Sequence, residues 1–290
     1  MNRPFRVGIL GAILVALFRS SVPAYAQAPA DKPVPQQAAT SDADLAKQLS
    51  NPVASLVSVP LQFNWDQPVG IDDDTRLTMN FQPVVPIGLN EDWNMIVRWI
   101  MPYIAQPRLS EEGVPTSGLS DIVASAFFSP AKPGRFIWGV GPVLLLPATS
   151  DPVLGSGKWG AGPTFVILKQ SGAWTYGALA NHIWSYAGDD FTGGAVRSNV
   201  NSTFLQPFVS YTTSTAVTYG VNLEASANWE AASGDEWTVP LHLTVTKLTK
   251  FGPFPMSVGG GVGIFTAAPG GHLTGACDSS PRCYCLGADG

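Results

Sequence analysis

From Val57 onward, apolar and polar residues alternate with a period of two in long segments that are separated by turns. This period places successive side chains on opposite faces of a β-strand. In the clearest segment one face carries Val217, Tyr219, Val221, Leu223, Ala225, Ala227 and Trp229, and the other carries Thr218, Asn222, Glu224, Ser226 and Asn228. Eleven such segments can be distinguished up to Thr266. Each supplies the roughly 9–11 residues that a tilted membrane-spanning strand needs.

The alternation has two interpretations. In a soluble sandwich the apolar faces point to a core, whereas in a membrane barrel they face lipid and the polar faces line the lumen. Two features favour the barrel. Aromatic residues end the apolar faces, as in the girdles at the two membrane interfaces: Trp65, Trp93, Tyr103, Trp229 and Trp237. The polar faces also carry large ionisable groups, which suit a wet interior. The sequence therefore predicts an all-β, antiparallel transmembrane barrel, whose closed sheet would satisfy its backbone hydrogen bonds in lipid.

The connections between the segments alternate in length, as they do in barrels with short periplasmic turns and longer outer loops. Long connections are expected around 70–74, 107–118, 150–157, 188–199 and 230–236, and short ones at 90–92, 132–135, 170–172, 212–215 and 250–253. Acidic residues gather in the long connections, and several bases flank the short ones. The long connections are therefore assigned to the outside of the cell.

The first 26 residues have the pattern of a signal peptide. Arg3 and Arg6 precede an apolar stretch at 7–18, and Ala24-Tyr25-Ala26 is a small-x-small cleavage site. An anchoring helix is the alternative, but the apolar stretch is too short for one. Cleavage after Ala26 would remove three arginines and no acids, so the formal charge of −5 would become −8.

Between the signal peptide and the barrel lie a linker and a short helix. Residues 27–40 contain repeated prolines and a Gln/Ala run, which predicts a flexible linker. Residues 41–49 predict a helix that is capped by Ser41 and stopped by Pro52. With residues 27–56 forming this linker and helix and residues 57–266 the barrel, the helix is expected to fold against the periplasmic mouth or partly plug it.

Composition excludes several other classes of protein. Only 13% of residues are charged against 45% hydrophobic, which is the opposite of intrinsic disorder. No basic block is present to bind nucleic acid. Outside the first twenty residues, no apolar run reaches the roughly 20 residues of a spanning helix.

Several segments resemble one family of proteobacterial outer-membrane barrels. They are LSNPVASL (49–56), TRLTMNFQPVVPIGLNEDWN (75–94), FFSPAKPG (127–134), FIWGVGPVLLLPATSD (136–151), KWGAGPTFVILKQ (158–170), WTYGALANHIWSYAGD (174–189) and NSTFLQPFVSYTT (201–213). The family is labelled as transporters of the phenol-degradation meta pathway and often also as "neuromedin U". The resemblance implies a barrel of about 12 strands with a channel or transport role and no catalytic residues. The family name further implies small aromatic or hydrophobic solutes, which no residue here establishes.

The end of the chain departs from the family pattern, which continues into a final strand. Residues 267–290 show no strand and contain all three cysteines, Cys277, Cys283 and Cys285. We expect an atypical tail, disordered or frameshifted, because the three cysteines cluster after 276 positions without one and the eleven strands before it are an odd number for a bacterial barrel. A metal knuckle that includes His272 is the alternative. Its spacing lacks the paired CxxC of zinc sites, so no metal site is predicted.

No catalytic motif stands out, and the chain is not expected to be an enzyme or to carry a cofactor. A Ser226–His242 pair on neighbouring strands is the one arrangement that would suit a hydrolase. Gly259-Gly260-Gly261 lacks the lysine and helix of a phosphate loop and is expected to mark backbone crowding or a curved strand. His182 is expected to pack or hydrogen-bond within its strand, beside Trp184 and Tyr186.

The candidate solute pathway consists of ionisable residues on the polar faces: Asp66, Arg76, Arg98, Asp121, Glu224 and His242, with Lys158 as a further member. Opposed charges in a lumen would set a transverse field that orients and filters solutes. The alternative is that arginines and acids pair across the lumen and merely fill it. Gln62, Asn80, Gln82, Thr218 and Asn222 would supply hydrogen bonds in either case.

The sequence thus predicts a passive outer-membrane channel of a Gram-negative bacterium. Its expected partners are outer-membrane lipid and lipopolysaccharide, the barrel assembly machinery and small solutes, with no nucleic acid. A non-conducting structural or surface-interaction barrel is the alternative.

Overall fold

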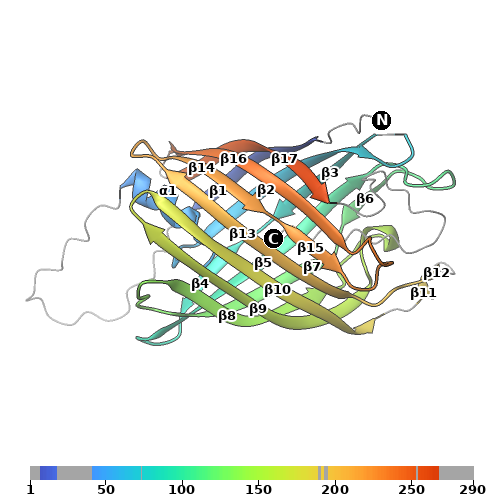
Figure 1. The fold of residues 1–290 in the computed structure, drawn as a ribbon, viewed down its shortest axis with the longest axis horizontal. Helices are drawn as coiled ribbons and strands as arrows, with labels where there is room; N and C mark the ends of the chain where they lie inside the picture. Colours follow the sequence, from blue (N-terminus) through green and yellow to red (C-terminus); the bar gives the residue numbers. More distant parts are fainter. Residues whose placement is uncertain are drawn as a thin grey trace, which may run out of the picture.

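The computed structural model describes residues 7–17, 41–72, 74–188, 191–192, 195–252 and 254–267, with the backbone alone for residues 7–17, 191–192 and 195–196. Fifteen strands form one antiparallel sheet. The sheet closes on itself because β1 (Val7–Leu17) pairs with both β17 (Phe254–Ala267) and β2 (Ser58–Val69). The molecule is therefore a closed β-barrel, with tilted strands (Figure 1).

The wall of the barrel follows the order of the chain. After β2 come β3 (Asp74–Phe81) with β4 (Val84–Gly88), β5 (Trp93–Gln106), β6 (Thr116–Leu119) with β7 (Ile122–Pro130), β8 (Ile137–Leu146), β9 (Lys158–Ser171), β10 (Trp174–Gly188), β13 (Asn201–Thr212), β14 (Val217–Leu223) with β15 (Ala225–Asn228), and β16 (Trp237–Phe251). Three pairs of short strands each share one place in the wall, so the fifteen described strands occupy twelve places. Eleven of these places are the strands that the sequence predicts. A separate hairpin of β11 (Phe191–Thr192) and β12 (Ala195–Val196) lies between β10 and β13.

The alternation of the sequence becomes the two faces of the wall. On β14, Tyr219 is 52% exposed, whereas the adjacent Thr218 is buried. On β16, Val245 is 47% exposed and His242 is buried. Exposed apolar side chains lie on β5, β7 to β10, β13, β14, β16 and β17, which is the pattern of a wall that contacts lipid. The predicted orientation, apolar outward, is confirmed on these strands.

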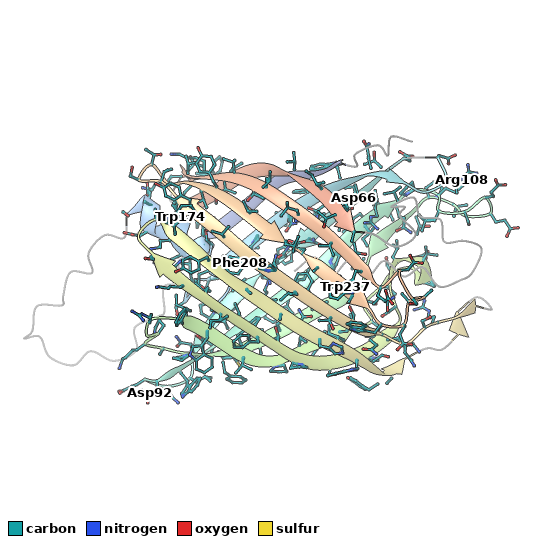
Figure 2. All side chains as sticks on the ribbon, in the orientation of Figure 1. Asp66, Asp92, Arg108, Trp174, Phe208 and Trp237 are labelled. Carbon is teal, nitrogen blue, oxygen red and sulfur yellow. The ribbon has the colours of Figure 1, made fainter. Side chains whose placement is uncertain are left out.

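Aromatic pairs lie near both ends of the barrel. Trp174 and Tyr211 contact edge to face with ring centroids 4.9 Å apart, and Trp229 and Trp237 do so at 5.9 Å. Figure 2 shows Trp174 near the end where α1 lies and Trp237 toward the opposite end. This spacing fits the two aromatic girdles of a membrane barrel.

The connections alternate in length, with one exception. Those between β5 and β6, β8 and β9, β10 and β13, and β15 and β16 are long, and the turns between them are short. The connection of residues 70–73 between β2 and β3 contradicts the expected long loop, because it is no longer than the short turn at 89–92. The reason is that β3 begins at Asp74, within the run of aspartates at 72–74 that predicted a loop.

The helix α1 (Asp42–Leu49) forms where the sequence predicts it. The Ser41 side chain caps it by accepting a hydrogen bond from the Asp44 N–H at 3.0 Å. This helix is too short and too polar to cross a membrane, and no other helix in the described residues has the length and hydropathy to do so.

The twelfth place in the wall holds β1, the stretch predicted to be the apolar core of a signal peptide. Eight of its residues pair with β17 and six with β2. Cleavage after Ala26 stays a prediction. The predicted linker 27–40, the tail from residue 268 with its cysteines and His272, and three of the loop acids (Asp73, Asp189, Asp190) lie outside the described residues.

Candidate solute pathway

One side of the lumen is apolar and tightly packed. Phe127, Phe204 and Ile96 are almost fully buried, and they form one cluster with Val53, Val166, Leu168 and Leu179. A second cluster contains residues of β5, β7, β8 and β10 and the residue before β13: Ile100, Val123, Val143, Leu145, Ile183 and Val200. The expectation that polar faces line the whole lumen is therefore wrong for the side formed by β5 to β13. On these strands both faces are largely apolar, because the interior packs as a core there.

The opposite side of the lumen is polar, and two predicted residues pair on it. Asp66 on β2 and Arg76 on β3 are direct cross-strand partners. Their side chains form an ion pair of 2.9 Å, and each is only about one-sixth exposed, at 15% and 17%. These two residues form an ion pair with each other, as expected if the charged side chains merely fill the lumen.

Arg98 on β5 belongs to a chain of amide side chains. Its guanidinium donates to Gln82 Oε1 at 2.8 Å, and Gln82 donates in turn to Gln62 Oε1 at 3.1 Å. Gln62 then donates to Asn64 Oδ1 at 3.0 Å. Amide side chains carry no charge, so these contacts position the guanidinium without neutralising it.

Glu224 lies between β14 and β15 and belongs to a second polar group. Its Oε1 accepts hydrogen bonds of 3.0 Å from Gln206 and Asn222, and His242 Nδ1 lies 3.5 Å from the same oxygen. The side chain is buried, and Oε2 has no hydrogen-bond partner in the part of the chain that the structure describes. A buried carboxylate oxygen without a donor is costly unless something else supplies one.

Arg98 and Glu224 stand on opposite walls. The order of the sheet leaves five places between β5 and the β14/β15 place in either direction around the barrel. Both residues line one cavity of about 280 Å³, together with Gln62, Gln82, Gln206 and Asn222. Their charges act on each other electrostatically, but no hydrogen bond or ion pair joins them among the described side chains. The structure thus brings two of the predicted residues to a common cavity without pairing them.

The segment that follows α1 closes this cavity at one end. Residues 48–52 with Ala54 and Leu56 form part of the cavity lining, and Val53 inserts into the apolar cluster of the lumen. The helix itself is tied to the β9–β10 turn, because Lys47 donates to the Gly172 carbonyl at 2.7 Å and Gln170 donates to the Lys47 carbonyl. Figure 1 shows α1 at one end of the barrel. We call residues 50–56 the plug segment.

The loop between β8 and β9 packs against neighbouring strand ends and connections on the side of the long connections. It contains the 3-10 helix η1 (Pro152–Leu154). Buried Asp121 accepts hydrogen bonds from the N–H and the hydroxyl of Ser156, at 2.5 and 2.6 Å. Arg197 donates to the carbonyl oxygens of Pro152 and Gly155. Asp121 therefore anchors a loop, and the buried Lys158 begins the strand that follows.

Arg197 is a functional candidate that sequence reasoning missed. It lies between residues without a repeating pattern, just after the short β11–β12 hairpin. Only the fold brings it against the loop at 152–155, so no local signal distinguishes it from an exposed loop arginine.

The arrangements considered for catalysis do not come together. Ser226 pairs with Thr238, whereas His242 pairs with Asn222, so the two lie four residues apart along the strands. His182 Nδ1 is hydrogen-bonded to Thr203 on the neighbouring strand at 2.7 Å, and its ring lies against Trp184. A Cβ at Gly259 would lie 2.1 Å from the Val245 carbonyl oxygen, which confirms backbone crowding at the glycine run. Within the described residues no three His, Cys, Asp or Glu side chains gather to hold a metal ion.

The strand pairing defines the class of protein, a closed antiparallel β-barrel with an apolar outer face. No protein-family model and no curated protein matches the chain. Among solved structures, the crystal structure of an outer-membrane channel from Pseudomonas putida F1 is similar, with a TM-score of 0.49 and 16% identity. The similarity covers 91% of this chain and 97% of that chain. A likeness of this strength supports no argument, so the fold and the site rest on the geometry described above.

Proposed function

We propose that the chain is an outer-membrane barrel of a Gram-negative bacterium that passes small solutes by passive diffusion. Closure of the sheet supports this, because a closed barrel satisfies its backbone hydrogen bonds within lipid. The exposed apolar face and the aromatic pairs near both ends support it as well.

The observation that carries the channel proposal is the cavity of about 280 Å³ inside the wall, lined by Arg98, Glu224 and six amide side chains. A barrel that served only as scaffold would gain nothing from charged groups held apart around an internal space. Burying a charge without a partner costs free energy, so such groups indicate contact with water or solute.

The family resemblance suggests aromatic or hydrophobic solutes. The apolar clusters on one side of the lumen would suit the apolar part of such a molecule. We therefore propose small solutes with an apolar part. The polar groups of the cavity would contact any charged part of the same molecule.

A non-conducting structural barrel is the second candidate. Two observations favour it: the plug segment inserts Val53 into the apolar cluster, and Arg197 holds the loop at 152–155 at the other end of the barrel. In this case the polar groups would only fill the interior.

Conductance distinguishes the two candidates. We expect discrete current steps from the purified protein in planar bilayers, and leakage of small solutes from liposomes that contain it. Heat-modifiable migration on SDS gels would show that the same preparation is folded. A folded preparation without current steps or leakage would contradict the channel.

The double variant Arg98→Gln/Glu224→Gln provides the second comparison. In a channel it changes conductance or ion preference, because the charges border the path. In a filled barrel it changes stability alone. Recovery of the protein in the soluble periplasm, with no heat-modifiable form, would contradict both candidates.

A further inference from the structure

The cavity between Arg98 and Glu224 has the features of a binding site for a molecule with two opposite charges. One wall presents a guanidinium that is hydrogen-bonded to a neutral amide, and the other presents a buried carboxylate whose Oε2 has no hydrogen-bond partner among the described residues. The two groups share the cavity and do not pair. Each therefore keeps the capacity for a charge-assisted hydrogen bond to a solute.

The amide side chains beside each charge occupy opposite walls in the same way. Gln82, next to Arg98, lies between β3 and β4, and Gln206, next to Glu224, lies on β13. Five places of the wall again separate these two positions in either direction. Each charge is thus hydrogen-bonded to a neutral amide, and His242 Nδ1 lies 3.5 Å from the Glu224 carboxylate.

We propose that this cavity binds linear zwitterions whose carboxylate and ammonium groups are separated by an apolar spacer, as in ω-amino acids. The carboxylate would meet Arg98 and the ammonium Glu224. The proposal rests on the channel proposed above, for which it names the solute class.

The form of the ligand follows from the geometry. Because the two side chains start from opposite walls, a ligand that contacts both must bridge the lumen between them. A spacer lets both ends bind together. Leu49, Val84 and Phe208 line the same cavity and provide apolar contacts for methylene groups. The volume of about 280 Å³ limits the ligand to a small molecule.

The test is binding of a length series to the folded full chain in detergent, measured by calorimetry. The probes are glycine, 4-aminobutanoate and 6-aminohexanoate, with butanoate and butylamine as single-charge controls. We expect the longer zwitterions to bind and the other three probes to bind at least about tenfold more weakly, because each lacks one of the two charged contacts. Equal binding of all five, or no binding of the longer zwitterions, would overturn the proposal.

Amino-acid substitutions test whether Arg98 and Glu224 form the binding site. Arg98→Gln and Glu224→Gln should each weaken binding of 6-aminohexanoate by about tenfold or more. Glu91→Gln and Arg135→Gln, which remove matched charges from exposed turns, should leave it unchanged. The swapped variant Arg98→Glu/Glu224→Arg should bind the zwitterion in the reverse orientation. Heat-modifiable migration checks the fold of each variant, and loss of binding in the swapped variant while it remains folded would contradict the pairing.

The binding proposal and the channel proposal are tested by different measurements, so one can be contradicted without the other. Calorimetry reports the site even if the barrel conducts no ions, and bilayer currents report the channel even if no zwitterion binds. In a conducting barrel, 6-aminohexanoate should also reduce the ion current, and glycine at the same concentration should not.

Discussion

At the scale of single residues, neighbours decide what each buried side chain does. Asp66 and Arg76 neutralise each other across adjacent strands. Asp121 accepts two hydrogen bonds from Ser156 at Oδ2, and Glu224 accepts hydrogen bonds from Gln206 and Asn222 at Oε1; the second oxygen of each carboxylate has no hydrogen-bond partner among the described residues. The same residue types therefore serve as filling, as a loop anchor and as a candidate contact for solute.

The apolar side of the lumen should be a source of stability. Replacing Phe127 by Ala removes a fully buried ring from the main cluster. We expect the free energy of unfolding to fall by about 3 kcal/mol or more, because the packed interior cannot close the cavity left behind. Urea unfolding in detergent, followed by tryptophan fluorescence, measures the loss.

The matched control is Val140→Ala on β8, whose side chain is 45% exposed on the outer face. It should cost much less than Phe127→Ala in the same assay. Similar losses for both variants would show that the interior is not packed as a core.

At the scale of elements, two segments pack at opposite ends of the barrel. The plug segment follows α1 and reaches the apolar cluster through Val53. The loop that contains η1 is fastened at its ends by Asp121 and Arg197. Both are connections between regular elements, which are less tightly held than the wall.

A charge in the plug segment should open the lumen. Val53→Asp places a carboxylate among apolar side chains, which is unfavourable unless the segment leaves the cluster. We expect higher single-channel conductance in planar bilayers than for the unaltered chain. Ser55→Asp, at an exposed position of the same segment, is the control and should conduct as the unaltered chain does. Unchanged conductance of folded Val53→Asp would show that the segment does not restrict the path.

The loop over the other end should depend on its anchor. Asp121→Ala removes the acceptor of both hydrogen bonds from Ser156. Thermolysin should then cleave near Leu154 faster than in the unaltered chain, because local opening exposes the loop. Mass spectrometry of the fragments measures the rate. Glu112→Ala, in an exposed outer loop, should not change it, and equal rates for both variants would contradict the anchoring role.

At the scale of the whole molecule, closure depends on the seam between β17 and β2. The eleven places from β2 to β17 form a sheet with two edges, and β1 covers both. An edge in lipid leaves backbone groups without partners, which costs several kcal/mol for each group (order of magnitude). The segment that covers it contains no polar side chain, unlike the alternating strands beside it.

Removal of residues 1–26 should therefore weaken the barrel. We expect a chain that starts at Gln27 to give a smaller heat-modifiable fraction than the full chain after refolding in detergent. The N-terminus of the protein isolated from membranes, determined by mass spectrometry, shows which form the cell retains. An equal folded fraction for both chains would show that β17 and β2 close the seam without β1.

Much of the fold could be predicted from the sequence, because a wall between lipid and lumen imposes a period of two. Residues 217–229 show this period and form β14 and β15. Ser41 marked the start of α1 because its side chain reaches the third residue onward. The apolar half of the lumen could not be predicted, since Val166 and Leu168 continue an apolar run that looks the same whichever face is buried. The hydrogen-bond donors to Glu224 could not be predicted either, because they depend on the register between neighbouring strands.

The sequence by itself determined the strands, the outward direction of their apolar faces, the alternating connections and the short capped helix. These follow from local periodicity and from hydrogen bonds within a few residues. Only the tertiary structure decided which charges pair and which stay apart, where the plug segment ends and what covers the seam. Arg98 and Glu224 are more than a hundred residues apart in the chain. Closure of the sheet places them on opposite walls of one cavity, and no local sequence pattern predicts that arrangement.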